Sequence, residues 1–130
     1  MNKEFIPYEQ ALELKELGFD EPCFGYFHPI HNNQLLLSTM FRSYYPNNAP
    51  LYQQAFRWFR NKHGFIGIPN VSNYTSEDKY VFDIFQKGND EIYFEGSDLT
   101  FKKKGKKEYD TYEEAELACL NKLIEIVKNK

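Results

Sequence analysis

Residues 51–64, LYQQAFRWFRNKHG, separate two groups of predicted strands and so decide how the chain is organised. At 100° per residue their apolar side chains, Phe56 and Phe59 among them, fall on one continuous arc of a helix. Arg57 and Arg60 fall on the opposite, polar arc. Gly64 follows the last turn, where glycine commonly ends a helix. The stretch therefore predicts an amphipathic helix whose phenylalanines enter the core.

Trp58 is the only tryptophan of the chain and falls at the border of the apolar arc. Together with Arg57 or Arg60 it is a candidate site for an anionic ligand or partner, because arginine pairs with anions and an indole ring stacks on planar groups. The alternative is that the two arginines belong to an ordinary solvent-exposed face of the helix, with Trp58 at its border and no ligand bound. We name Arg57, Trp58 and Arg60 as candidate ligand-binding residues.

Runs of β-forming residues flank this helix on both sides. Before it, CFGYFH (23–28) and QLLLSTMF (34–41) predict a hairpin, because PIHNN between them supplies turn residues. Residues 42–50 are rich in Pro and Asn and predict a loop. After the helix, a meander is predicted from four further runs: FIGIP (65–69), YVFDIF (80–85), EIYFE (91–95) and LTFKKK (99–104).

Two more helices are predicted near the two ends of the sequence. PYEQALELKELGF (7–19) is amphipathic and is expected to end at Gly18, with Phe19 folding back. TYEEAELACLNKLIEIVKNK (111–130) is the most regular helical pattern, and its Thr-x-x-Glu start predicts a capping box. The apolar arc of this helix is wider than the stripe that packing on one sheet face would bury. Leu117 and Ile124 fall outside that stripe, so they predict a homodimer seam.

These elements predict an α+β fold in a single small domain that covers residues 1–130. A length of 130 residues suits one core better than two. The simplest assembly is one antiparallel sheet, made of the hairpin and the meander, with about three helices packed on one face.

Composition narrows the classes of function. The net charge of −3 argues against general binding to nucleic acid, which needs a clustered positive footprint. Aromatic residues make up 18% of the chain; they predict an aromatic core or, alternatively, a surface patch that stacks on a partner. The two cysteines, Cys23 and Cys119, are expected to be reduced, buried residues of a cytosolic protein. No signal peptide and no membrane span are predicted.

Motifs for catalysis or cofactor binding do not stand out. The sequence has no phosphate-binding glycine loop and no Gly-x-Ser-x-Gly elbow. His28 and His31 lack further ligands at zinc-site spacing, so we predict no metal site and no cofactor. Most carboxylates fall in turns and caps, where they have backbone roles. We therefore expect that the protein is not an enzyme.

A second candidate site lies just before the 51–64 helix. In FRSYYPN (41–47), Arg42, Tyr44 and Tyr45 combine a cation with two rings, which can pair with and stack on a nucleotide. The alternative is a loop held by its own rings. The basic turn Lys102–Lys107 is either a solvated hairpin tip that protects an edge strand or a finger that contacts phosphate or an acidic partner.

Three segments resemble a family of small uncharacterised proteins encoded by phages and prophages of Bacteroidota gut bacteria. They are ALELKELGFDEPC (11–23), PLYQQAFRWFRNKHG (50–64) and YDTYEEAELACLNKLIEIVKNK (109–130). The resemblance implies a phage-type origin and a bacterial host cytoplasm, and it carries over no catalytic residue.

The expected function is therefore that of a non-enzymatic phage-type binding protein. It would block or sequester a host component, either a defence protein or a small anionic nucleotide signal. Two alternatives stay open. One is a nucleic-acid-associated accessory protein that uses the Lys102–Lys107 turn, and the other is a small enzyme whose site is built from scattered carboxylates.

Overall fold

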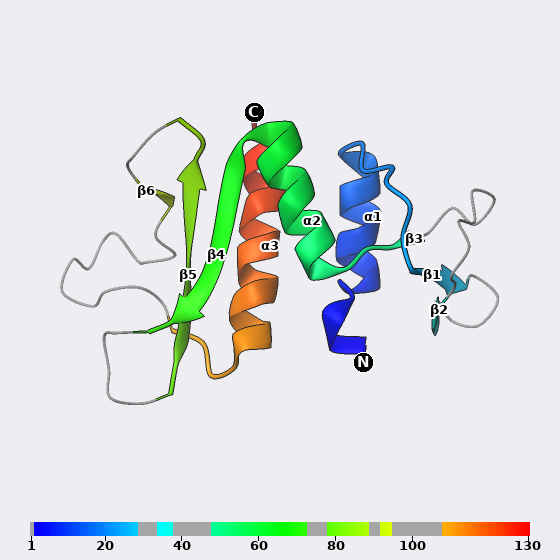
Figure 1. Ribbon diagram of the computed structural model, residues 1–130, viewed down its shortest axis with the longest axis horizontal. Helices are drawn as coiled ribbons and strands as arrows, with labels where there is room; N and C mark the ends of the chain where they lie inside the picture. Colours follow the sequence, from blue (N-terminus) through cyan, green and yellow to red (C-terminus); the bar gives the residue numbers. More distant parts are fainter. Residues whose placement is uncertain (1, 29–33, 38–47, 73–77, 89–91, 95–107) are drawn as a thin grey trace. The chain divides into compact units, whose positions relative to one another are not determined.

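The computed structural model describes residues 2–28, 34–37, 48–72, 78–88, 92–94 and 108–130. The chain divides into two compact units, residues 1–55 and residues 56–130 (Figure 1). Among the described residues, the first unit contains one helix and a small sheet, and the second contains a long helix and a larger sheet. The helix α2 begins in the first unit and continues into the second.

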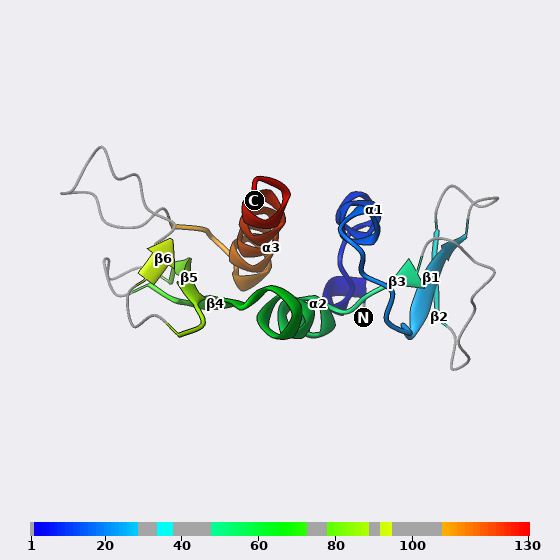
Figure 2. The ribbon, with the colours of Figure 1, turned by 90° about the horizontal axis from the view of Figure 1, so that it is seen from above.

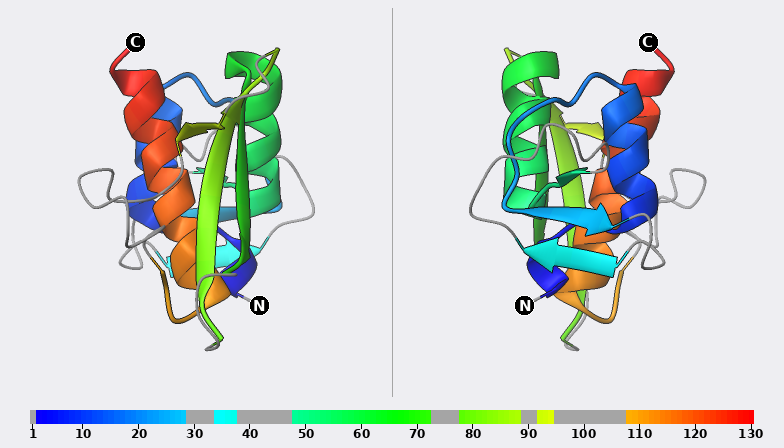
Figure 3. Two further views of the ribbon diagram at one scale, coloured as in Figure 1. Left: turned by 90° about the vertical axis from the view of Figure 1, so that its left-hand side faces the viewer. Right: turned by 90° about the vertical axis from the view of Figure 1, so that its right-hand side faces the viewer.

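The first unit is built from a short 3₁₀ turn, a helix and three strands. The turn η1 (Asn2–Glu4) precedes α1 (Tyr8–Glu16), and the strands are β1 (Gly25–His28), β2 (Gln34–Leu37) and β3 (Asn48–Ala49). The strand order is β2-β1-β3 and both pairings are antiparallel, as the two arrows β1 and β2 in Figure 3 show. The predicted hairpin is confirmed. However, the two residues of β3 lie in a segment predicted to be a loop.

The end of α1 follows the prediction. Gly18 has a φ of 102°, a left-handed conformation that glycine adopts without steric cost. The N–H of Phe19 donates to the carbonyl of Leu14 over 2.9 Å, which is the bond expected when a chain folds back after a helix. The Phe19 side chain is buried.

The second unit begins within α2 (Tyr52–Trp58), which is followed by the π-helical turn η2 (Phe59–His63). Three strands follow: β4 (Phe65–Val71), β5 (Tyr80–Gln86) and β6 (Ile92–Phe94). They form an antiparallel sheet in the order β4-β5-β6. The helix α3 (Tyr112–Lys128) lies over one face of this sheet (Figure 2).

The core of the second unit lies between α3 and the strands β4 and β5. A Cβ atom at Gly67 would come within 2.7 Å of the Cys119 Sγ and 3.0 Å of the Leu123 Cδ1. The missing side chain at Gly67 therefore lets α3 approach the sheet closely. The largest fully buried side chains of this unit are Phe59, Phe65, Ile84, Leu120 and Leu123.

The strand β4 lies at an edge of its sheet, since it pairs only with β5 among the described residues. The Lys87 N–H bonds to the Gly64 carbonyl, and the Ser72 N–H bonds to the Lys79 carbonyl. The register is continuous between these bonds. The backbone N–H and C=O groups of even-numbered β4 residues therefore bond to β5, and those of odd-numbered residues point away from β5. Pro69 occupies one of these outward positions.

The α+β class and the antiparallel pairing are confirmed. The strands are not joined in one sheet, however, because the hairpin of residues 25–37 and the strands after residue 64 belong to two separate sheets. The predicted strand 99–104 lies outside the described residues. The single domain of residues 1–130 stays a prediction.

The predicted dimer seam needs a correction. Ile124 is only 2% exposed, so it is part of the core and unable to face a second copy. Leu117 is only partly buried. The homodimer stays a prediction without Ile124 in its seam.

The start of α3 provides the first test of the structure. Thr111 has an extended conformation, and its Oγ1 accepts a hydrogen bond from the Glu114 N–H over 3.1 Å. We expect Thr111→Ala to lower the free energy of unfolding by about 1 kcal/mol, because one N–H of the first turn loses its partner. Thr111→Ser, which keeps the hydroxyl, is the control. Equal denaturation midpoints for wild type and Thr111→Ala would contradict the cap.

Candidate functional site

Three of the six predicted site residues, Arg57, Trp58 and Arg60, lie in the part of the chain that the structure describes. Arg42, Tyr44 and Tyr45 lie outside the described residues. Arg57 and Arg60 are exposed, as the polar arc predicted. Trp58, predicted at the border of the apolar arc, is only 5% exposed and is part of the core. It therefore has little surface to offer a ligand.

Trp58 is buried next to the π-helical turn that follows it. Its ring lies 5.0 Å from the Phe59 ring and 4.9 Å from the His63 ring, edge to face in both cases. A π-helical turn uses wider i to i+5 bonds than an α-helix. The turn ends at Gly64, which has a φ of 76° and donates its N–H to the Phe59 carbonyl. Constant 100° spacing holds up to Trp58, the last residue of α2, and does not describe the turn from Phe59 to His63.

Basic residues from three segments of the second unit lie near this turn. The Lys130 Nζ, just beyond α3, lies 4.7 Å from the centre of the Phe65 ring. Lys87, just beyond β5, bonds through its N–H to the Gly64 carbonyl over 2.7 Å. We call the following group the basic end: Arg60, Lys62, His63, Lys87 and Lys130. In Figure 1 the end of η2, the end of α3 and the end of β5 lie together at the top of the second unit.

The charges of the basic end act on His63. Its pKa is lowered, first by burial and then by the positive charges of Lys130 and Lys62. The imidazole is therefore neutral at pH 7. Its Nε2 is enclosed and has no hydrogen-bond partner among the residues that the structure describes. Arg60, Lys62, Lys87 and Lys130 are exposed, so they can contact a ligand.

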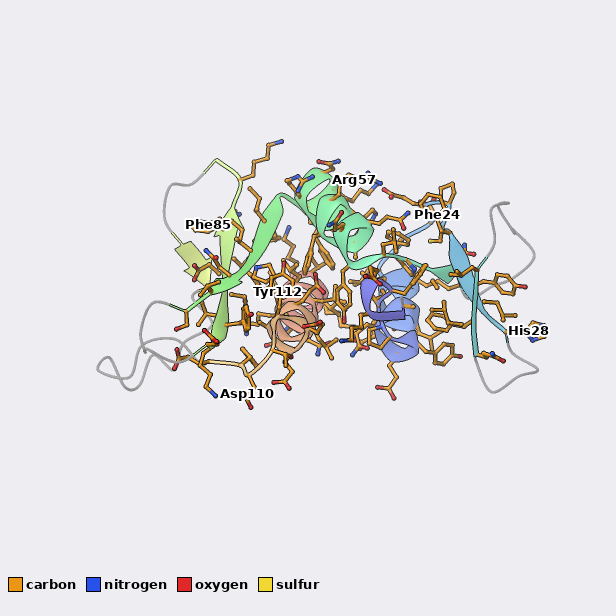
Figure 4. All side chains as sticks on the ribbon, turned by 60° about the horizontal axis from the view of Figure 1, so that its bottom comes forward. Phe24, His28, Arg57, Phe85, Asp110 and Tyr112 are labelled. Atoms are coloured by element: carbon orange, nitrogen blue, oxygen red, sulfur yellow. The ribbon has the colours of Figure 1, made fainter. Side chains whose placement is uncertain are left out.

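Carboxylates gather at the opposite end of the second unit. Asp110 bonds to Lys79, and Glu108 bonds to the Ser72 hydroxyl. Figure 4 shows Asp110 and Tyr112 at the start of α3, far from Arg57 on α2. Further carboxylates in the first turns of α3 are Glu113, Glu114 and Glu116.

Between the two ends, Glu125 bonds to Lys122 over 3.2 Å. Among the described residues, the cations of the basic end and the carboxylates around the start of α3 thus lie at different ends of the second unit.

Neither cysteine is suited to nucleophilic chemistry. Burial, and then the nearby charge of Glu21, raises the pKa of Cys23 to about 12. Burial is also the main cause that raises the pKa of Cys119, with a further contribution from Asp83. Both thiols are therefore protonated at neutral pH, and a protonated thiol is a weak nucleophile. Cys119 instead packs against the position of Gly67.

Lys62, His63, Lys87 and Lys130 were missed in the sequence. Each is an ordinary polar residue at the end of an element, where cations also stabilise the negative end of a helix. Only the fold brings them together, because they come from three separate segments. The basic run in NKH (61–63) is the one local signal that pointed here.

The chain matches no protein-family model, no curated protein and no solved structure. In the parts of the chain that the structure describes, no helix is long and apolar enough to cross a membrane. The resemblance to phage-encoded proteins stays a prediction. The residues of the basic end are therefore the basis for a functional proposal.

Proposed function

We propose that the protein is a non-enzymatic binding protein that captures a small, anionic, nucleotide-like ligand at its basic end. In a phage context, the ligand would be a signal molecule of the bacterial host, and the protein would act in the host cytoplasm by sequestering it. The observation that carries this proposal is that Arg60, Lys62, Lys87 and Lys130 come from three segments that lie near one turn.

The charge arrangement supports an anionic ligand. Four cationic side chains come from three segments, so an anion placed between them can be contacted from several sides. Charge-assisted hydrogen bonds from Arg and Lys to oxyanions are stronger than neutral ones. The Lys130 Nζ lies over the buried Phe65 ring, so this cation sits beside the turn.

A binding role also agrees with the chemistry of the surrounding residues. The raised pKa values of Cys23 and Cys119 leave these thiols unactivated. His63 has no carboxylate partner among the described residues that would orient it as a general base. A sequestering protein must bind its ligand and release it unchanged. This role needs no activated nucleophile at the basic end.

Removing two cations of the basic end tests the proposal. We expect Arg60→Ala combined with Lys87→Ala to weaken binding of a cyclic dinucleotide or an ADP-ribose derivative by at least about tenfold. Both residues are exposed, so the melting temperature should change little. Calorimetric titration measures the affinity, and ligand recovered from heat-denatured complex should be chemically intact.

The matched control is Lys3→Ala combined with Lys15→Ala, which removes the same charge from exposed positions of the first unit. Equal loss of affinity in both double variants would mean that net charge, and not the basic end, attracts the ligand. Turnover of the ligand would reject a sequestering role. A host protein captured from extract through Arg60 and Lys87, with no nucleotide bound at any concentration, would reject the small ligand.

A further inference from the structure

The position of His63 links the basic end to the core. Its ring contacts the Trp58 ring at 4.9 Å and the Phe59 ring at 6.1 Å. The enclosed atom is Nε2, so Nδ1 is the ring nitrogen that can exchange a proton with solvent or ligand. An N–H at Nε2 that faces aromatic carbon has a weak acceptor in the π-electrons.

We propose that the basic end is specific for doubly charged oxyanions of the phosphoryl type, and that binding such a group is coupled to uptake of a proton by His63. This inference rests on the proposed function and names its ligand class and its control by pH. The Trp58 ring contacts the His63 ring, so the fluorescence of Trp58 should change when His63 takes up a proton. The single tryptophan thus supplies a signal from the site itself.

The charges that face His63 explain the coupling. Lys62 of η2 and Lys130 beyond α3 disfavour a further positive charge on the imidazole. The next side-chain carboxylate along α3, Glu125, is already bonded to Lys122. An anion with two charges reverses the local potential, so the free protein holds His63 neutral and the complex favours the imidazolium.

A doubly charged group fits this site better than a singly charged one. A phosphate monoester carries a charge of about −1.5 to −2 at pH 7 and offers three acceptor oxygens. Three oxygens can accept bonds from side chains that approach from different segments. One negative charge would be neutralised by a single lysine and would leave little attraction for a proton at His63.

The direction of the pH effect follows from linkage. Since binding takes up a proton, the affinity should fall as the pH rises through the window between the His63 pKa values of the free and bound protein. Within that window the decrease approaches about tenfold per pH unit for one proton. Above the window the affinity should become constant, held by the four permanent cations.

Inorganic sulfate is the probe for the test, because it keeps both negative charges over the range used and so has no pH dependence of its own. Its affinity is measured by calorimetry between about pH 5.5 and pH 8, the range in which histidines titrate. Trp58 fluorescence is followed over the same range, with and without sulfate. We expect tighter binding at low pH and a fluorescence midpoint that moves to higher pH when sulfate is present.

The variant His63→Gln sharpens the result, since any sulfate binding that remains should no longer depend on pH. The fluorescence midpoint of the wild type is an independent readout if that variant fails to fold. Sulfate binding that is constant with pH, with a stationary midpoint, overturns the coupling and leaves the proposed function standing.

Two further measurements identify the chemical class of the ligand and the kind of molecule to which the bound group belongs. No sulfate binding at any pH, together with no nucleotide binding, overturns both proposals. Competition with sulfate by a nucleoside monophosphate but not by a nucleoside supports the phosphoryl group of a nucleotide as the bound chemistry. Competition by a phosphoserine peptide alone would instead indicate that the phosphoryl group belongs to a protein. That result would overturn the proposal of a nucleotide ligand.

Discussion

Phe59→Ala is expected to lower the free energy of unfolding by about 3–5 kcal/mol. The Phe59 side chain is fully buried and packs edge to face against Trp58. It also begins the π-helical turn that carries His63 and Gly64. Its loss leaves a cavity at a place where the surrounding rings are fixed by the turn, so the site cannot easily collapse. Domains of this size have only about 5–15 kcal/mol of stability, so the variant will be close to unfolding at room temperature.

Chemical denaturation of Phe59→Ala and of a matched control measures this effect. The control is Phe24→Ala, which removes the same ring from a side chain that is 64% exposed at the start of β1 (Figure 4). The change in Phe24→Ala should stay within about 0.5 kcal/mol. Equal destabilisation of the two variants would mean that Phe59 is not a core residue.

Gly67→Ala is expected to have the second largest effect, a loss of about 1–3 kcal/mol from adding a single methyl group. The new Cβ would lie 2.7 Å from the Cys119 Sγ and 3.0 Å from the Leu123 Cδ1. These distances are below van der Waals contact, so α3 or β4 must move. The φ of Gly67 does not fall in the left-handed region, so the cost comes from crowding and not from backbone strain.

A double-mutant cycle with Cys119→Ala separates crowding from other causes. Cys119→Ala removes the sulfur that the new methyl group meets. The combined variant should therefore be more stable than the sum of the two single changes predicts, by about 0.5–3 kcal/mol. Strict additivity would show that α3 does not approach β4 as closely as the structure describes.

Local patterns were sufficient to predict much of the fold. The capping box at Thr111 and the stop at Gly18 depend on bonds between neighbours in the chain, and both are present. The hairpin and three of the meander strands follow from alternation and turn residues. The division into two sheets could not be predicted, because strand pairing is decided by partners distant in sequence. β3, with two residues, leaves no periodic signal at all.

Less of the candidate site could be predicted. Arg60 was identified from its place on the polar arc, and it lies at the basic end. Trp58 was placed at the border of the apolar arc, and packing against Phe59 and His63 buries it. Lys87 and Lys130 lie far from Arg60 in sequence. Only the packing of α3 on β4 and β5 brings their charges together.

The outward position of Pro69 in β4 has a consequence for solubility. FIGIPNV is an apolar, uncharged segment at the edge of a sheet, a kind of segment that recruits further strands and starts aggregation. Proline has no N–H to donate, so an added strand would meet a gap in the middle of β4. The hydrogen-bond ladder of any fibril built on this edge would be broken there. Pro69 thus lets the protein keep an apolar edge strand while blocking its growth into a polymer.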